Sequence, residues 1–236
     1  MMNRKAFFEK VADIVKNDKA HNYLQKIQRA YWLAKLAHKG QTRDEGERYF
    51  EHCRKVALLF IEHINFINKE LNSVVDIEKW HEFCGRFTIV TNRCFNSYCF
   101  SQIIMTALLH DCVEDCFIPE ELLATECFDF VQTNVEDLSK VKPIFDSLTG
   151  SVKEKIRKTD DEYYTNISGN VFAGYVKIFD RLDNLRSMEK VWTKERQAKY
   201  IAETEKYILP IAEKTDKELH SLLLEQIAKI KQKGGE

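Results

Sequence analysis

The chain has 236 residues, a length that suits one large domain able to bury most of its apolar surface. Its 36 basic and 37 acidic side chains almost cancel to a formal net charge of -1, which argues against nucleic acid or a membrane surface as a partner. Only 3 prolines and 8 glycines occur, few for a sheet protein with many tight turns.

No secretion signal or membrane span is predicted. The opening sequence MMNRKAFFEK lacks the apolar core of a signal peptide, and no run is apolar enough to cross a bilayer. The 7 cysteines are therefore expected to stay reduced in a cytoplasmic protein, and none forms a C-x-x-C pair. A zinc site built from His81, Cys84, Cys94 and Cys99 has loose spacing, so we interpret these residues as packing residues.

Helical spacing of apolar residues begins early in the chain and predicts an all-α fold. One face of the first strongly periodic helix carries Ile27, Tyr31, Ala34 and His38. Residues 39–48 (KGQTRDEGER) form a polar loop with two glycines. A long helix follows, whose apolar stripe comprises Val56, Leu59, Phe60, Ile64, Ile67 and Leu71. His52 lies four residues before Val56 and is expected to point inward with that stripe.

The middle of the chain is less regular. Between Asn72 and Ser97 we expect a helix that is capped by Asp76 and runs through His81, followed by an irregular tail. An apolar helix then leads into the hexapeptide HDCVED at residues 110–115. Further helices are expected from Pro119, from Val135 to Leu148 and, as a short charged segment, within Lys153 to Tyr164.

The last third of the chain contains polar residues in an otherwise apolar stripe. From Val171 onward the stripe comprises Phe172, Val176, Phe179, Asp180 and Asn184. Two final helices carry Ala198, Ile201, Ala202, Tyr207 and Ile208 and, after Pro210, Leu219, Leu222, Leu223, Ile227 and Ile230. We therefore predict one all-α domain over residues 1–236.

The HDCVED hexapeptide combines four titratable side chains at the end of an apolar segment. If the segment is helical, His110 and Glu114 share one face, and Asp111 and Asp115 share the next. Burying these charges without a partner would cost several kcal/mol per ion. A bound cation removes that cost, and a histidine beside an aspartate offers mixed nitrogen and oxygen ligands. The alternative interpretation is a chance polar end of a helix.

Inward-facing polar residues on three predicted helices suggest a metal site. They are His52, His110, Asp111 and Asp180. Such a set suits Mn²⁺, Fe²⁺ or Zn²⁺ and leaves positions open for water, whose pKa the cation lowers. Glu114 and Asp115 would then orient or deprotonate that water. Taken singly, each histidine is more often a hydrogen-bonded core residue, and Asp180 has Lys177 and Arg181 as neighbouring partners.

A locally basic segment accompanies these candidate ligands and comprises Lys39, Arg43, Arg48, Arg54 and Lys55. Beside a metal, arginine suits a phosphate-bearing substrate because its guanidinium can bind two oxygens at once. An ordinary solvated basic turn explains the same pattern equally well.

Ordered motifs along the chain resemble the hydrolase domain of the RelA/SpoT family. They are AHKGQTR at 37–43 with Gly46, Tyr49 and His52, HDCVED at 110–115, and KIFDRLDN at 177–184. Two weaker similarities are DSLT at 146–149 with Glu162 and Tyr163, and the closing segment AET at 202–204 with Tyr207 and PIA at 210–212. The resemblance covers roughly residues 20 to 213 and implies a single HD-domain helical bundle with a metal site at its centre.

The resemblance also implies an activity. The family removes the 3′-pyrophosphate of ppGpp and pppGpp, the alarmones of the stringent response, giving GDP or GTP and pyrophosphate. One Mn²⁺ per chain would be held by His52, His110, Asp111 and Asp180, while Glu114 and Asp115 handle the water. The implied contacts to the nucleotide substrate come from Arg43, Lys39, Asn184, Lys177 and Tyr163. With room for this domain alone, the chain resembles the stand-alone small alarmone hydrolases, and its oligomeric state stays open.

Departures from the family pattern leave the substrate open. Arg48 and Cys53 replace common prolines, while Asp183 replaces a common histidine and Ser187 a common threonine near the expected nucleoside pocket. The segment between about residues 72 and 98 is longer than usual, which indicates an insertion. One alternative therefore keeps the fold and metal but acts on ppApp-type alarmones or the 2′-phosphate of NADPH. Another is a non-catalytic nucleotide-binding module.

Overall fold

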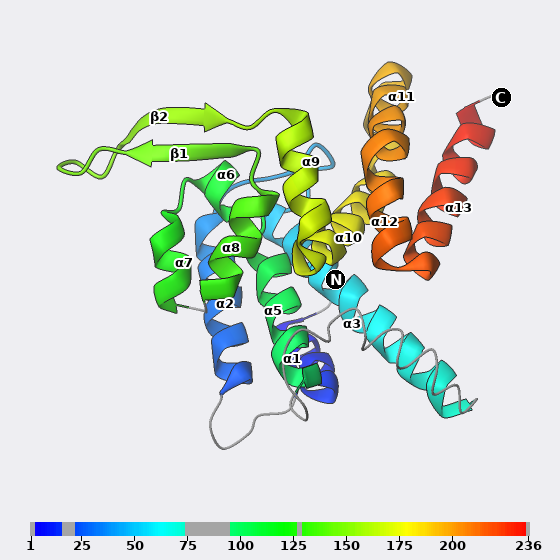
Figure 1. Cartoon of the computed structure of the whole chain (residues 1–236), viewed down its shortest axis with the longest axis horizontal. Coiled ribbons are helices and arrows are strands. Elements are labelled where there is room, and N and C mark those ends of the chain that lie inside the picture. The colour runs from blue at the N-terminus through cyan, green and yellow to red at the C-terminus, as the bar shows by residue number, and fades with distance from the viewer. Residues whose placement is uncertain (1–2, 16–21, 74–94, 127–128, 235–236) are drawn as a thin grey trace.

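A computed structural model describes residues 3–15, 22–73, 95–126 and 129–234 (Figure 1). The amino-terminal part comprises α1 (Arg4–Ile14), α2 (Tyr23–Ala37) and α3 (Tyr49–Ser73). The central part comprises α5 (Phe95–Leu109), α6 (Cys112–Cys116), α7 (Glu120–Glu126), α8 (Asp129–Leu138), β1 (Val141–Phe145) and β2 (Val152–Arg157). The last part comprises α9 (Asp160–Gly169), α10 (Val171–Ser187), α11 (Lys194–Glu203), α12 (Leu209–Thr215) and α13 (Lys217–Gly234).

Helix α5 lies at the centre of the bundle and packs against α2, α3, α8 and α10. Every residue of α5 from Cys99 to Leu109 is buried, and Ile103, Ile104 and Leu108 are completely so, as expected for a helix surrounded by others. In Figure 1 the carboxyl-terminal helices α11 to α13 gather on one side of this core, and the β1–β2 hairpin projects on the other. The prediction of an all-α bundle is confirmed apart from this hairpin.

Helix α10 begins at a cap that the sequence supplies. The Asn170 side chain accepts hydrogen bonds from the backbone N–H groups of Phe172 (3.1 Å) and Ala173 (3.2 Å), which have no partner inside the helix. Every α10 residue from Ala173 to Ile178 except Lys177 is buried. This cap fixes where the helix starts and so which turn of α10 carries Asp180.

The predicted helix from Val135 to Leu148 is wrong beyond Leu138, and the predicted short helix within Lys153 to Tyr164 begins only at Asp160. Residues 141–145 and 152–157 instead form an antiparallel hairpin. Pro143 cannot donate a helical hydrogen bond, and valine and isoleucine favour the extended strand. Gly150 adopts a φ of 65°, a left-handed conformation that closes the turn.

The last two helices also divide differently from the prediction. The chain stays helical through Pro210, because a π-helical segment at Thr204–Ile208 joins α11 to α12. The break comes at Asp216, whose side chain caps α13 by accepting from the N–H groups of Glu218 (3.0 Å) and Leu219 (3.2 Å).

Parts of two predictions fall outside the described residues. The helix expected from Asp76 to His81 and most of the insertion expected between about 72 and 98 lie there. So do three members of the loose zinc set, while the fourth, Cys99, is buried in α5. None of the helices within the described ranges is long and apolar enough to span a membrane.

Candidate metal and substrate site

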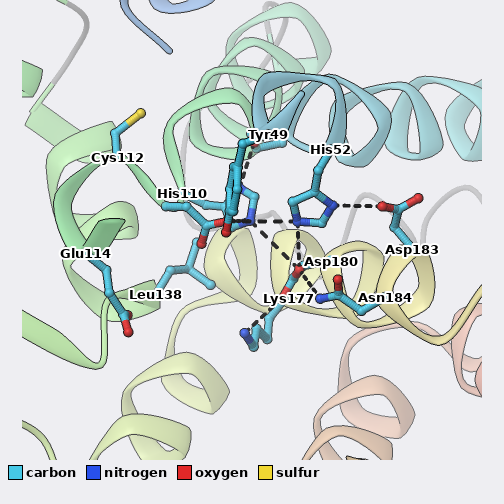
Figure 2. A network of polar contacts seen from close by, with 12 residues as sticks. Tyr49, His52, His110, Cys112, Glu114, Leu138, Lys177, Asp180, Asp183 and Asn184 are labelled. Atoms are coloured by element: carbon cyan, nitrogen blue, oxygen red, sulfur yellow. Dashed lines mark hydrogen bonds and ion pairs between the residues drawn. The ribbon is translucent and has the colours of Figure 1, made fainter. Parts of the chain in front are cut away.

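Four predicted metal ligands from separate parts of the chain converge on one point (Figure 2). His52 Nε2 lies 3.2 Å from Asp180 Oδ1 and 3.9 Å from Asp111 Oδ2. His110 Nε2 lies 3.0 Å from Asp111 Oδ2 and 3.9 Å from Asp180 Oδ1. Two imidazole nitrogens and two carboxylates thus face one another at the junction of α3, α5, α6 and α10.

The hexapeptide HDCVED reaches this point through a bend between two helices. Helix α5 ends at Leu109 and α6 begins at Cys112, so the segment is not the continuous helix on which the predicted pairing of side chains depends. Asp111 adopts φ −99° and ψ −2°, and its carbonyl accepts the Asp115 N–H at 2.9 Å to start α6. The bend brings His110 and Asp111 together at the cluster.

Hydrogen bonds fix which nitrogen of each histidine faces the cluster. His110 Nδ1 donates to the Ala107 carbonyl at 2.9 Å, and His52 Nδ1 donates to the Asp183 carboxylate at 2.7 Å. In the neutral imidazoles both Nε2 atoms therefore present lone pairs to the carboxylates of Asp111 and Asp180. His110 Nε2 is buried without a hydrogen-bond partner among the described residues. Converging acceptors of this kind fit a divalent cation, and a histidine held through its other nitrogen is the usual metal ligand.

Without a bound cation, a proton on His52 supplies the positive charge that the carboxylates favour. Burial alone would lower the pKa of His52, but hydrogen bonds to Asp180 and Asp183 raise it to about 9. Burial alone would raise the pKa of Asp111, but His110 lowers it. The pKa of Asp180 is likewise lowered, against burial, chiefly by Lys177. The carboxylates thus stay ionised in the interior, where a positive charge between them is strongly favoured.

Helix α10 surrounds Asp180 with polar partners at helical spacing. Lys177 Nζ donates to Asp180 Oδ2 at 2.9 Å, and Asn184 Nδ2 donates to Asp180 Oδ1 at 2.7 Å. Arg43, from the loop between α2 and α3, donates to Asp183 Oδ2 at 3.2 Å and to Asn184 Oδ1. Three of the predicted substrate-binding residues, Arg43, Lys177 and Asn184, therefore adjoin the cluster.

The other two predicted substrate contacts, Lys39 and Tyr163, do not adjoin the four converging side chains. Lys39 is exposed just beyond the end of α2, and the described contacts of the cluster do not include it. Tyr163 is buried, and its hydroxyl donates to the Leu138 carbonyl at 3.0 Å. Its ring instead lies beneath Lys177, whose Nζ is 5.6 Å from the ring centroid. Tyr163 therefore contacts Lys177 rather than the four converging side chains themselves.

The two predicted water-handling acids, Glu114 and Asp115, follow Asp111 on α6. Glu114 accepts the backbone N–H of Lys140 at 2.8 Å, and Figure 2 shows it to one side of the imidazoles. Burial raises the pKa of Glu114, and burial together with Asp111 raises the pKa of Asp115. Both carboxyls are thus shifted toward the range in which a side chain can exchange protons near neutral pH.

Two residues that hydrogen-bond to the converging side chains, Tyr49 and Asp183, were not predicted to do so from the sequence. Tyr49 donates its hydroxyl to Asp111 Oδ2 at 2.9 Å, and its ring stacks on His38 at 4.6 Å between centroids. Asp183, predicted only as a neighbour of the nucleoside, holds His52 and Arg43. The available signal was spacing, since Tyr49 precedes His52 by three residues and Asp183 follows Asp180 by three, so each pair shares a helical face.

Comparisons with known proteins agree with the motifs. No protein-family profile matches the chain. A GTP pyrophosphokinase from Myxococcus xanthus is 26% identical over 187 residues, which cover 79% of this chain but only 20% of that protein. Among solved structures, a metazoan ortholog of SpoT that hydrolyses ppGpp aligns over 91% of this chain and 98% of that one, with a TM-score of 0.56 and 20% identity. The chain has the fold of that SpoT ortholog. This shared fold agrees with the helical bundle that the resemblance to the RelA/SpoT hydrolase domain implied.

Proposed function

We propose that the protein is a divalent-metal-dependent hydrolase that removes the 3′-pyrophosphate from ppGpp and pppGpp. The observation that carries this proposal is the convergence of His52, His110, Asp111 and Asp180 with two cationic side chains beside them. The SpoT-like fold supports the choice of substrate, because the metazoan SpoT ortholog hydrolyses ppGpp.

The four converging side chains would hold one Mn²⁺, with Fe²⁺ and Zn²⁺ as chemically acceptable alternatives. A cation bound there supplies Lewis-acid polarisation of the phosphoryl group and lowers the pKa of a water molecule. Lys177 offsets the charge of Asp180 and so keeps the buried cluster from accumulating negative charge.

Arg43 would bind the substrate, and the acids of α6 would assist the attack of water on it. The Arg43 guanidinium lies between Asp183 and Asn184 at the edge of the cluster, and it would turn one of its donor pairs to the phosphates of the nucleotide. Asn184 would then be free to bind the nucleoside. Glu114 and Asp115, with raised pKa values, would move the proton that leaves the attacking water.

The decisive experiment is turnover of ppGpp by the purified full chain. With Mn²⁺ we expect release of GDP and pyrophosphate in equal amounts, and we expect Asp111→Ala and Glu114→Ala to lower the rate by at least about a hundredfold. Glu195→Gln, which removes an exposed carboxylate on α11, is the matched control and should keep full activity. No turnover with Mn²⁺, Fe²⁺ or Zn²⁺ would reject the proposal.

A panel of substrates separates the alternatives. The Asp183 carboxylate accepts hydrogen bonds from His52 and Arg43. It therefore places a negative charge next to the expected nucleoside pocket. Comparing ppGpp, ppApp and NADPH at equal concentration tests whether this acid redirects the enzyme. If ppApp or NADPH is turned over faster than ppGpp, the proposed metal-dependent chemistry stands but ppGpp is not the preferred substrate. Tight nucleotide binding without turnover would identify a non-catalytic module.

A further inference from the structure

A thiol–imidazole pair lies just behind the candidate site and takes no part in the proposed hydrolysis. Cys116 Sγ, at the end of α6, is 3.2 Å from His38 Nδ1, beyond the end of α2. The same nitrogen lies 2.7 Å from Gln41 Oε1, and Cys112 Sγ lies 3.7 Å from the opposite nitrogen. Cys116 is partly exposed, whereas the other described cysteines are buried: Cys53, Cys99 and Cys112.

We infer that Cys116 is a site of covalent modification, a nucleophilic thiolate that hydroperoxides oxidise. His38 Nδ1–H is shared between the Cys116 sulfur and the Gln41 oxygen, so it can stabilise a thiolate once the imidazole holds both protons. Reactive cysteines are accessible and lie beside such a cationic donor, and buried structural cysteines are inert. Cys116 is partly exposed and lies beside His38, whereas the other described cysteines are buried.

The pKa values of Cys116 and His38 are shifted in the directions that favour a thiolate–imidazolium pair. Hydrogen bonds from Cys112 and His38 outweigh burial and the nearby Asp115 carboxylate, and together they lower the pKa of Cys116 to about 6. Burial opposes protonation of His38, but hydrogen bonds to Cys116 and Gln41 raise its pKa. At pH 7 a thiol with a pKa of about 6 is about 90% ionised, against a few per cent for an ordinary cysteine.

The oxidation step is a two-electron transfer. The Cys116 thiolate attacks one peroxide oxygen, an S–O bond forms, the O–O bond breaks and hydroxide leaves. The His38 imidazolium gives that hydroxide a proton, so the products are a sulfenic acid and water. Sulfur is oxidised and peroxide is reduced, and a thiol reductant reverses the change.

Modification at Cys116 would reach the candidate site through two chains of contacts. His38 stacks on Tyr49, which donates to Asp111. Gln41 Nε2 donates to the Asp115 carbonyl at 3.3 Å, and Gln41 belongs to the loop that presents Arg43. An oxygen added to the sulfur would compete with Gln41 for His38 and disturb both chains. This consequence for turnover rests on the proposed function, whereas the reactivity of Cys116 does not.

The test is alkylation of the folded, full-length protein by iodoacetamide between pH 4.5 and 9. Proteolysis after Glu114 separates Cys112 from Cys116, so peptide mass spectrometry follows Cys116 alone. We expect its alkylation rate to rise with a midpoint near pH 6, while Cys53, Cys99 and Cys112 stay unlabelled. In His38→Asn the midpoint should move up by about two pH units, and the matched control His220→Asn on α13 should leave it unchanged.

A second measurement traps the oxidised form. After treatment with hydrogen peroxide, dimedone should mark Cys116 in the wild type, and the mark should be absent in Cys116→Ser and when dithiothreitol is added before dimedone. The wild-type pH profile needs no variant, so it decides even if a substitution prevents folding. A midpoint at pH 8 or above, or alkylation of Cys116 no faster than that of the buried cysteines, would overturn the inference.

Discussion

His52 donates its Nδ1–H to Asp183 Oδ2 across 2.7 Å, and Arg43 donates to the same oxygen at 3.2 Å. One carboxylate therefore links a candidate metal ligand to a candidate phosphate ligand. A carboxylate behind a metal-binding histidine raises the basicity of the ligand nitrogen and fixes the ring. The same carboxylate competes with an anionic substrate for the arginine. Asp183 should thus favour metal binding and oppose substrate binding.

Asp183→Asn separates these two effects. An amide in this position keeps its size but lacks the charge, so Mn²⁺ affinity should fall by about 10- to 100-fold. Arg43 loses an ionic partner, so at saturating Mn²⁺ the KM for ppGpp should fall. Calorimetric titration with Mn²⁺ measures the first effect without any turnover, and steady-state kinetics measures the second.

Glu45→Gln is the matched control for that substitution. Glu45 lies 3.9 Å from Arg43 Nε but is not among the described partners of His52. Its loss should also lower the KM while leaving Mn²⁺ affinity unchanged. Equal Mn²⁺ affinity in Asp183→Asn and the wild type would show that Asp183 does not support the metal ligand.

Tyr49→Phe tests the hydroxyl that supports Asp111. The ring can keep its stacking on His38, while the hydrogen bond to Asp111 Oδ2 is lost. We expect a loss of about 1 kcal/mol in the free energy of unfolding and a several-fold weaker affinity for Mn²⁺. Tyr163→Phe, which removes a hydroxyl bonded to the Leu138 carbonyl, should lower stability by a similar amount without changing Mn²⁺ affinity. If both variants bind Mn²⁺ like the wild type, Tyr49 is only a packing residue.

The sequence predicted which polar side chains converge better than it predicted the residues that hydrogen-bond to them. An inward position for His52 follows from its spacing to the apolar stripe of one helix, and the same holds for Asp180. The pairing of His52 with Asp183 depends instead on how α3 packs against α10, which no local pattern encodes. The hairpin was missed because its strands are only five and six residues long and lie in a charged segment where helical spacing also fits. Tyr163, predicted as a substrate contact, is buried, and its place beneath Lys177 likewise depends on how α9 packs against α10.

Glu203→Gln should make the protein less sensitive to acid. Burial alone would raise the pKa of Glu203, but hydrogen bonds from Tyr164 and Arg181 lower it to about 2. Because the folded-state pKa is the lower one, the ionised carboxylate stabilises the fold above about pH 4.5, and this contribution is lost as the pH falls toward 2. Urea unfolding at pH 6 and pH 3.5 measures the change.

The size of the acid effect is modest, because Glu203 is partly exposed and solvent screens its charge. We expect the wild type to lose about 1 kcal/mol more than Glu203→Gln between the two pH values. Glu225→Gln, which alters an exposed ion pair on α13, serves as the control and should follow the wild type. Parallel losses in all three proteins would contradict the role assigned to Glu203.

Mn²⁺ should stabilise the folded chain whether or not ppGpp is the substrate. A ligand that binds only the folded state raises the free energy of unfolding by about 2.7 kcal/mol at a hundred times its Kd. Thermal unfolding with and without Mn²⁺ should therefore show an upward shift in Tm for the wild type and for Glu195→Gln. His52→Ala, His110→Ala and Asp180→Ala should each remove most of that shift, because each takes one ligand from the cluster. A shift that survives in all three variants would place the cation elsewhere and leave the converging imidazoles and carboxylates without their proposed role.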